Sequence, residues 1–337
     1  MKHHVRARFV VRVRRYTLLR ILLFIGLLAP HTYAQQQMKI HQIGYLIYGA
    51  PAAVAHRTEA LRMGLRDLGY IDGKNMMLII RSADTANRLP EVAAEFVRLK
   101  VDVIFATSST EVEAARQVTK TIPIVFATHA DPVGVGHATS LARPGGNATG
   151  LAVIQTEIVT KQLEMLKQAL PQLSRVAMLL TATAPSHRPA AEALEAAASK
   201  LGVQLVAVSV RTPKDLDAAF NTMTRERVTG FVAVSSPLTR TERARLGELG
   251  LQHHLPGMFI TSENVEAGGL MSYGPDLIEM TRRSAIHIDK ILKGARPSEL
   301  PVEQALKFEF VINTKTARTL GVTIAPSVLV RADRLIE

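Results

Sequence analysis

The chain has 337 residues, which is enough for about two domains of ordinary size. With 47% hydrophobic and 21% charged residues, its composition is that of a globular protein, and it argues against wholesale disorder, a collagen-like chain and a multi-span membrane protein. There is no cysteine, which excludes disulfides, cysteine-based zinc sites and thiol catalysis.

The net charge of +12 is unevenly distributed along the chain. Residues 1–34 contain seven of the 41 Lys and Arg residues and no acid, so the remainder has 34 cations against 29 acids, a net charge of +5. A charge of that size is ordinary for a soluble surface and does not indicate a nucleic-acid partner. We therefore expect no nucleic-acid binding.

The excess of positive charge belongs to a targeting pattern. A basic stretch at 1–15 precedes an apolar run at 18–29 and small residues at 32–34. This order predicts a cleavable signal peptide, residues 1–34, and export to a periplasm. The apolar run is shorter than the roughly 20 residues of a comfortable membrane span. An uncleaved anchor is the alternative, and Arg14-Arg15 leaves twin-arginine export open beside the general secretory route.

From residue 39 onward, short apolar runs alternate with amphipathic stretches, which predicts βαβ units in a parallel sheet. Between the first strands, apolar residues recur at helical spacing, as in Leu61, Leu65 and Leu68. Gly69 follows this helix, where a left-handed cap is expected. The strands predicted in the first half are 40–46, 76–80, 101–106 and 122–127.

The same alternation resumes after a turn-rich stretch at 143–147. We therefore predict an α/β fold of two doubly wound Rossmann-like lobes. A further strand near 269–273 and a long helix at 276–292 indicate that the chain crosses between the lobes more than once. The helices predicted in the second half are 158–169, 189–200, 214–225 and 240–252, and the strands are 175–180, 203–210, 230–234, 257–260 and 308–312.

Ligands of open α/β sheets bind outside the carboxyl ends of the strands, close to helix amino termini that favour anions. The hydroxyl-rich run 107–110 ends one strand and opens a helix, so it is suited to holding a carboxylate, although a serine there also suits simple helix capping. Asp131 is suited either to pairing with a ligand ammonium or to organising its own turn, and Tyr48 either to stacking on a ligand or to ordinary packing. The candidate ligand-binding residues at the strand ends are Tyr48, Ser108, Ser109, Thr110, Asp131, Ser186, Ser236, Glu263 and Tyr273.

Motifs for bond-breaking chemistry are missing from the sequence. It contains no G-x-x-x-x-G-K-[ST] phosphate loop, no G-x-S-x-G elbow and no G-x-G-x-x-G between a first strand and its helix. His129, Asp131 and His137 form a conceivable metal set, but histidines of a turn beside a solvated aspartate are the commoner explanation. We therefore expect no metal, no cofactor and no catalysis.

Several longer motifs resemble one known family. They are IGYL at 43–46, LRMGLRDLGYIDGKN at 61–75, DPVGVG at 131–136, SLARPGGNATG at 140–150, VEAGGLMSYG at 265–274, ILKGARPSELPVEQ at 291–304 and KFEFVINTKTARTLGVTIAPSVLVRADRLIE at 307–337. In this order they closely resemble the ABC transporter substrate-binding proteins related to tryptophan and tyrosine uptake. One departure is Ser235-Ser236-Pro237-Leu238, where family members often carry an Asp-Pro-Leu segment.

The resemblance implies the type I periplasmic binding protein fold, in which three crossovers join two lobes around a ligand cleft. It implies that 38–154 plus 268–296 form lobe 1 and that 155–267 plus 297–337 form lobe 2. The implied function is capture of a small polar solute, an amino acid or another small carboxylate, by a monomer that delivers it to an ABC permease. A ligand-sensing module for a membrane receptor and an exported α/β enzyme that uses an acidic residue are the alternatives.

Overall fold

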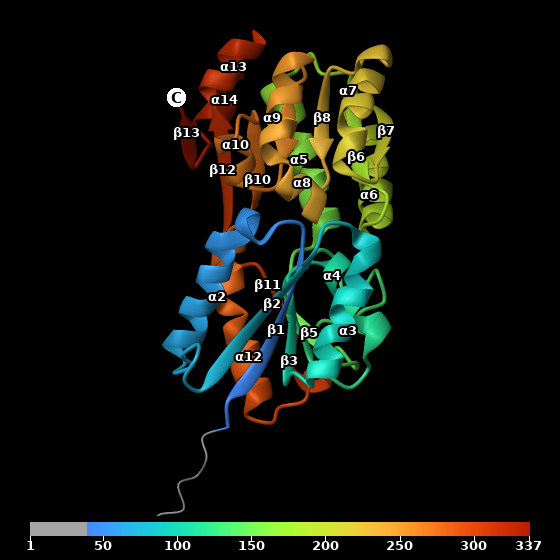
Figure 1. The fold of residues 1–337 in the computed structure, drawn as a ribbon. Coiled ribbons are helices and arrows are strands. Elements are labelled where there is room, and N and C mark those ends of the chain that lie inside the picture. Colours follow the sequence, from blue (N-terminus) through green and yellow to red (C-terminus); the bar gives the residue numbers. More distant parts are fainter. Residues whose placement is uncertain (1–38) are drawn as a thin grey trace, which may run out of the picture. The chain divides into compact units, whose positions relative to one another are not determined.

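The computed structural model describes residues 39–337, and the predicted signal peptide lies outside them. Ile40–Glu337 forms one compact unit that contains two β-sheets (Figure 1). Among the described residues, no helix combines the length and apolar character that spanning a membrane requires. The two parallel-sheet lobes predicted from the alternating pattern are confirmed.

The first sheet has six strands, all parallel. Its central strands are buried without interruption because helices cover both faces, as the apolar run VIFA predicts. Gly44 allows Phe96 to pack directly on this sheet, since a Cβ at Gly44 would lie 2.6 Å from the ring. In sheet order, the strands are β11 (Glu303–Gln304), β5 (Ala148–Ala152), β4 (Ile124–His129), β3 (Val103–Ala106), β1 (His41–Tyr48) and β2 (Met76–Ala83).

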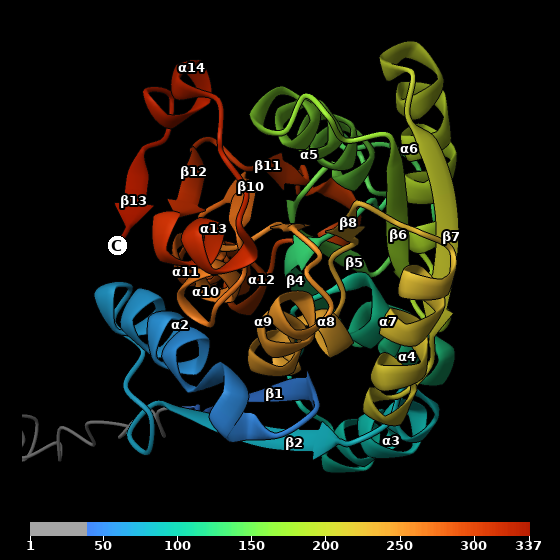
Figure 2. The ribbon, with the colours of Figure 1, turned by 90° about the horizontal axis from the view of Figure 1, so that it is seen from above.

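The second sheet has seven strands, parallel except where β10 meets β12. Its edge strand β7 lies beside the helices α6 and α7 (Figure 2). In sheet order, the strands are β13 (Arg334–Ile336), β12 (Phe308–Asn313), β10 (Met271–Pro275), β9 (Gly257–Phe259), β8 (Gly230–Ala233), β6 (Arg175–Thr181) and β7 (Gln204–Val210).

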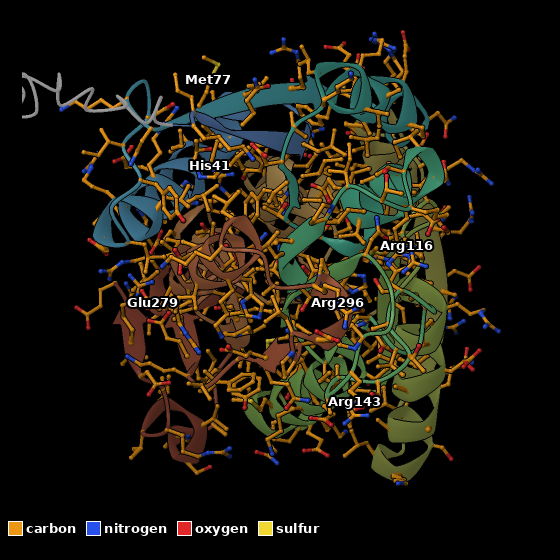
Figure 3. All side chains as sticks on the ribbon, turned by 90° about the horizontal axis from the view of Figure 1, so that it is seen from below. His41, Met77, Arg116, Arg143, Glu279 and Arg296 are labelled. Atoms are coloured by element: carbon orange, nitrogen blue, oxygen red, sulfur yellow. The ribbon has the colours of Figure 1, made fainter. Side chains whose placement is uncertain are left out.

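The helices fall at the amphipathic stretches of the sequence. Gly69 has a φ of +90° just beyond the first long helix, which is the left-handed conformation expected at this position. Exposed side chains such as Met77 and Glu279 lie on the outside of the molecule (Figure 3). In chain order, the α-helices are α2 (Ala55–Asp67), α3 (Leu89–Leu99), α4 (Ser109–Val118), α5 (Gln155–Ala169), α6 (His187–Leu201), α7 (Leu216–Arg225), α8 (Pro237–Thr241), α9 (Arg243–Gln252), α10 (Ser262–Glu266), α11 (Leu277–Arg283), α12 (Ala285–Leu292), α13 (Thr314–Leu320) and α14 (Pro326–Leu329).

Three of the four short 3₁₀ helices lead directly into α-helices, and the last lies in a connection. They are η2 (Pro51–Val54), η3 (Ala86–Arg88), η4 (Pro213–Asp215) and η5 (Pro297–Glu299). Each contains or follows a turn-forming residue, and three of the four begin with proline, whose fixed φ suits the first helical position.

The chain passes between the two sheets three times, and two of these crossings differ from the expected boundaries. We expected the return to lobe 1 at 268, but β10 pairs with β9 and β12 and so belongs to the second sheet. The return follows at Asp276, whose carboxylate caps α11 by accepting the amides of Ile278 and Glu279 at 3.0 Å. The last crossing comes after Gln304 rather than after 296, because β11 pairs with β5.

Two further expectations required correction, and one strand was missed. The predicted helix 276–292 is two helices divided at Ser284, and both pack against α2. The predicted helix 240–252 begins earlier, as α8, because Ser236 and Pro237 already form a helix start. Strand β5 was not predicted, since its sequence ATGLA has small residues and a glycine in place of the usual branched side chains.

Candidate functional site

A cavity lies where strands of both sheets end. It encloses about 660 Å³ of space that protein atoms do not occupy, part of which is open to the solvent. Polar and apolar side chains share the wall, and both lobes contribute to it. The lining residues are Arg57, Ser108, Ser109, Thr110, Thr128, Ala130, Val153, Gln155, Ala184, Ala233, Ser235, Ser236, Pro237, Thr239, Arg240, Phe259, Ile260, Thr261, Asn264 and Leu277.

The amino terminus of α4 forms part of the lobe 1 wall. Ser108 occupies the N-cap position with extended backbone, but its side chain makes no capping hydrogen bond. Its hydroxyl instead donates to Glu111, one turn into the helix. Ser109 lies across from Ser186 of the other lobe, with the two hydroxyl oxygens 3.3 Å apart. The positive end of α4 therefore faces the cavity without a side-chain oxygen to satisfy it.

Glu111 is fully buried and organises the wall behind this helix start. Its Oε1 accepts hydrogen bonds from the Thr107 hydroxyl at 3.2 Å and from the Tyr48 amide at 3.5 Å. The same oxygen lies 3.5 Å from Nη2 of Arg240, which α8 supplies from the other lobe. Because a buried carboxylate needs several partners, Glu111 is used by contacts within the protein and is not available to a ligand.

Arg57 is the second guanidinium of the cavity and comes from α2 in lobe 1. Its side chain is only 1% exposed, and its Nη2 donates to Oε2 of Glu263, in lobe 2, at 2.9 Å. Burial alone would raise the pKa of Glu263, but the charges and hydrogen bonds of Arg57 and His56 together lower that pKa. We call Arg57–Glu263 and Arg240–Glu111 the crossed ion pairs, because each joins an arginine of one lobe to a glutamate of the other.

Both arginines have guanidinium nitrogens that their ion pairs do not use. Nε and Nη1 of Arg57 and Nε of Arg240 are buried and have no hydrogen-bond partner among the described residues. Burial, and then the neighbouring charge of Arg57, lower the pKa of Arg240. Two guanidiniums close enough to perturb one another are the arrangement that an anion between them would stabilise.

Gln155 contributes an acceptor at the point where the chain crosses to lobe 2. It is 1% exposed, and its Nε2 donates to the carbonyl of Ser235 at 3.2 Å. Its Oε1 is buried without a partner within residues 39–337. His187 also binds the Ser235 carbonyl through Nε2, at 2.9 Å, and accepts the Thr181 amide at Nδ1, at 2.7 Å. Burial lowers the pKa of His187 to about 4, so this histidine is a neutral brace for the Ser235 carbonyl.

A family model for the ABC transporter substrate binding protein matches residues 50–336. The chain belongs to this family. A tyrosine-binding protein of Clostridioides difficile (strain R20291) is 25% identical to it over 259 residues, which are 76% of this chain and 74% of that protein. The family therefore places the chain among substrate-binding proteins.

Solved structures agree with this family. A conserved domain protein of Vibrio cholerae is 27% identical and covers 88% of this chain and 100% of its own, with a TM-score of 0.82. An ABC domain of Streptococcus pneumoniae in complex with L-Trp is 22% identical, with a TM-score of 0.81 and coverage of 88% and 100%. The type I periplasmic binding protein fold is confirmed, and the chain is a solute-binding protein of an ABC transporter.

Four of the nine predicted ligand residues of this substrate-binding protein line the cavity. They are Ser108, Ser109, Thr110 and Ser236. Ser186 touches the wall through its contact with Ser109.

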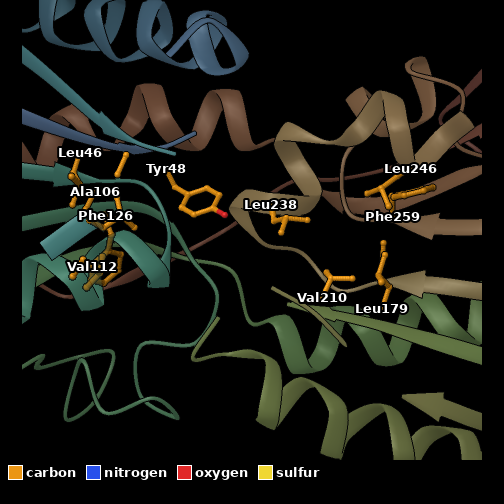
Figure 4. Close-up of a cluster of buried hydrophobic side chains, with 14 of the residues drawn as sticks. Leu46, Tyr48, Ala106, Val112, Phe126, Leu179, Val210, Leu238, Leu246 and Phe259 are labelled. Atoms are coloured by element: carbon orange, nitrogen blue, oxygen red, sulfur yellow. The ribbon is translucent and has the colours of Figure 1, made fainter. Parts of the chain in front are cut away.

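The other four predicted residues do not line this cavity. Tyr48 is 5% exposed and belongs to an apolar cluster of both lobes, where its ring points toward Leu238 (Figure 4). Asp131 accepts the Gly134 amide at 2.8 Å and so organises its own turn. Glu263 is held by Arg57, and the ring of Tyr273 stacks on Phe308 at 5.7 Å. Their assignment to the ligand stays a prediction.

The histidines near Asp131 form a hydrogen-bonded chain. Nε2 of His129 lies 2.7 Å from Nδ1 of His137, whose Nε2 lies 2.6 Å from Glu113. Arg116 adds a further contact by donating to the His137 carbonyl. Within residues 39–337 no group of three or more His, Asp or Glu residues is arranged to hold a metal ion.

The sequence reasoning overlooked Arg57, Gln155 and Arg240. A signal for Arg57 was present, because Val54, Arg57 and Leu61 share one face of a helix at spacings of three and four residues. An arginine on an apolar helix face is paired or functional, since burying its charge is otherwise costly. Arg240 and Gln155 carry no such mark in the sequence.

Proposed function

We propose that the substrate is a small organic carboxylate bound between Arg57 and Arg240. One observation carries this proposal: both guanidiniums line the cavity while keeping buried nitrogens without a partner among the described residues. A carboxylate satisfies such donors in pairs. The uncapped start of α4 supplies further N–H groups and the positive end of a helix dipole.

Binding by both lobes gives the mechanism. Lobe 1 offers Arg57 and the start of α4, and lobe 2 offers Arg240 and the Ser235 region. A ligand that touches both walls has its full set of contacts only when the lobes are together, so it shifts the equilibrium toward that form. A permease then recognises the closed protein and receives the solute unchanged, with no catalytic step.

The setting of this function follows from the sequence. We infer that residues 1–34 direct export to a periplasm and are removed, and that the mature protein acts as a monomer. The names of the relatives support a ligand with a carboxylate, since one is a tyrosine-binding protein and another was crystallised with L-Trp. Uptake through a permease and an ATPase is the purpose that the family supports.

Removal of one guanidinium tests the proposal. The protein is unfolded, freed of any co-purified ligand, refolded, and screened by thermal shift against small organic acids and amino acids. A ligand present at 100 times its Kd should stabilise the wild type by about 2.7 kcal/mol. The Arg57→Met and Arg240→Met variants should each bind about 10- to 100-fold more weakly, because each loses charged hydrogen bonds worth about 1.5–3 kcal/mol.

The matched control is Arg188→Met, since Arg188 lies on α6 with 86% of its side chain exposed. This variant should bind like the wild type. Wild-type affinity in both Arg57→Met and Arg240→Met would contradict the proposal.

A further inference from the structure

The charged residues that line the cavity indicate which kinds of carboxylate it can bind. Among residues 39–337, Arg57 and Arg240 are the charged side chains that line it, and no aspartate or glutamate does so. The remaining polar lining consists of hydroxyls, Asn264 and Gln155. The wall is therefore built for a negative group and offers no opposite charge to a positive one.

The nearest acids are already occupied. Glu111 accepts from Thr107, Ser108 and the Tyr48 amide in addition to facing Arg240. Glu263 is held between Arg57 and His56, with 2.9 Å and 2.5 Å contacts. It borders an adjoining cavity beside Asp276 and Glu309, which shares Ile260, Thr261 and Leu277 with the first.

Asp131, the residue that the sequence suggested for an ammonium, is turned to the Gly134 amide and does not line the cavity. A ligand ammonium would thus lie next to two guanidiniums in a cavity whose described lining includes no carboxylate, and burying a charge without a partner is costly.

The lining also contains a buried neutral acceptor, Oε1 of Gln155, which has no hydrogen-bond partner in the described part of the chain. A ligand hydroxyl or an uncharged N–H would satisfy this atom. The apolar lining, including Phe259, Ile260 and Leu277, would cover a hydrocarbon body. We propose that this site selects organic acids that carry a neutral hydrogen-bond donor, such as hydroxy acids, and discriminates against zwitterionic amino acids. This inference rests on the carboxylate function proposed above.

Matched ligands test this selectivity on the wild-type protein. Each carbon skeleton is offered as the amino acid, the hydroxy acid, the acid without either group and the neutral amide: phenylalanine, 3-phenyllactate, 3-phenylpropionate and 3-phenylpropanamide, with the corresponding sets for tyrosine, tryptophan, leucine, alanine and aspartate. Thermal shift finds the skeletons that bind, and calorimetry measures their Kd. In every skeleton that binds, we expect the hydroxy acid to bind at least about tenfold more tightly than the amino acid.

The outcomes separate the two levels of the proposal. Amino acids that bind as tightly as their hydroxy acids, with a loss in Arg57→Met, would overturn the selectivity and leave the carboxylate function standing. Binding of the neutral amides alone, or of no acid in the panel, would overturn both.

A variant sharpens the result. Gln155→Glu should place a carboxylate at the position of the unpartnered Oε1 and reduce the preference for the hydroxy acid over the amino acid by about tenfold or more. Gln155→Met should abolish only the tighter binding of the hydroxy acid relative to the unsubstituted acid. Selectivity unchanged in both folded variants would overturn the role given to Gln155.

Discussion

Ser108 and Ser236 stand at matching places in the two lobes, each between the end of a strand and the start of a helix, and their side chains do different things. Ser236 caps its own helix by accepting the Thr239 amide at 3.1 Å, and its oxygen lies 2.8 Å from the hydroxyl of Thr181. Ser108 gives its hydroxyl to Glu111 and leaves the helix start uncapped. The same local signal therefore yields a satisfied helix start in lobe 2 and an open, anion-favouring one in lobe 1.

A second contrast lies within the crossed ion pairs. Glu111 is completely buried and has three protein donors besides Arg240, whereas the side chain of Glu263 retains 17% exposure. Glu111 is therefore more buried than Glu263 and depends more on its protein partners. Charges in such surroundings depend on one another, because removing one partner leaves the other buried and uncompensated.

The largest effect on stability is expected from Glu111→Gln. Loss of this charge leaves Arg240 without its partner and weakens three hydrogen bonds, so the free energy of unfolding should fall by about 4 kcal/mol. Urea denaturation of the ligand-free protein measures this difference. Glu195→Gln, at an exposed position of α6, is the control and should stay within about 0.5 kcal/mol. An equal change in the free energy of unfolding of both variants would contradict the structural role given to Glu111.

A pH-dependent loss of about 3 kcal/mol is expected from His187. Its pKa is about 4 in the folded protein and about 6.5 when unfolded, so the unfolded chain binds the extra proton first as the pH falls. The contribution is complete above pH 6.5 and disappears between about 6.5 and 4. Unfolding free energies of the wild type and of His187→Asn, measured across this range, should converge toward low pH.

The exposed His254 provides the control, since His254→Asn should keep the pH profile of the wild type. Parallel profiles of the wild type and of His187→Asn would show that the brace on Ser235 does not titrate in this way.

A smaller effect, about 1 kcal/mol, is expected when the cap of α8 is removed in Ser236→Ala. Ser109→Ala is its counterpart in lobe 1, where the Ser109 hydroxyl lies 3.3 Å from that of Ser186 and caps no helix among the described residues. We expect Ser236→Ala to lower stability more than affinity and Ser109→Ala to lower affinity more than stability. Denaturation and calorimetry on the same samples would reveal a reversal of this order, which would refute the contrast between the two helix starts.

The smallest effect is expected from Asp131→Ala. Its carboxylate binds the Gly134 amide, so the variant should lose no more than about 1 kcal/mol of stability and keep its affinity within about twofold. Calorimetry with the best-binding hydroxy acid and the matching amino acid measures both affinities. A loss of tenfold or more that is confined to the amino acid would restore the ammonium role to Asp131 and contradict the selectivity proposed for the cavity.

The core strands could be predicted because their apolar runs are short and continuous, as in β3 and β4, and the helix that contains Leu61 and Leu65 because its spacing repeats. The start of α4 was found as part of the cavity wall because ligands of such sheets bind at strand ends. The sheet to which β10 belongs could not be predicted, since the sequence of a five-residue strand does not indicate which strands it pairs with.

By itself, the sequence determined the alternating elements, the two-lobed class and the hydroxyl-rich helix start at Ser108, because periodicity and turn residues act over a few neighbouring positions. Only the tertiary structure decided that Arg57 and Arg240 meet in one cavity and that the glutamate of each pair comes from the other lobe. Pairings between residues more than 100 positions apart depend on how two sheets face one another, and no local pattern encodes that distance.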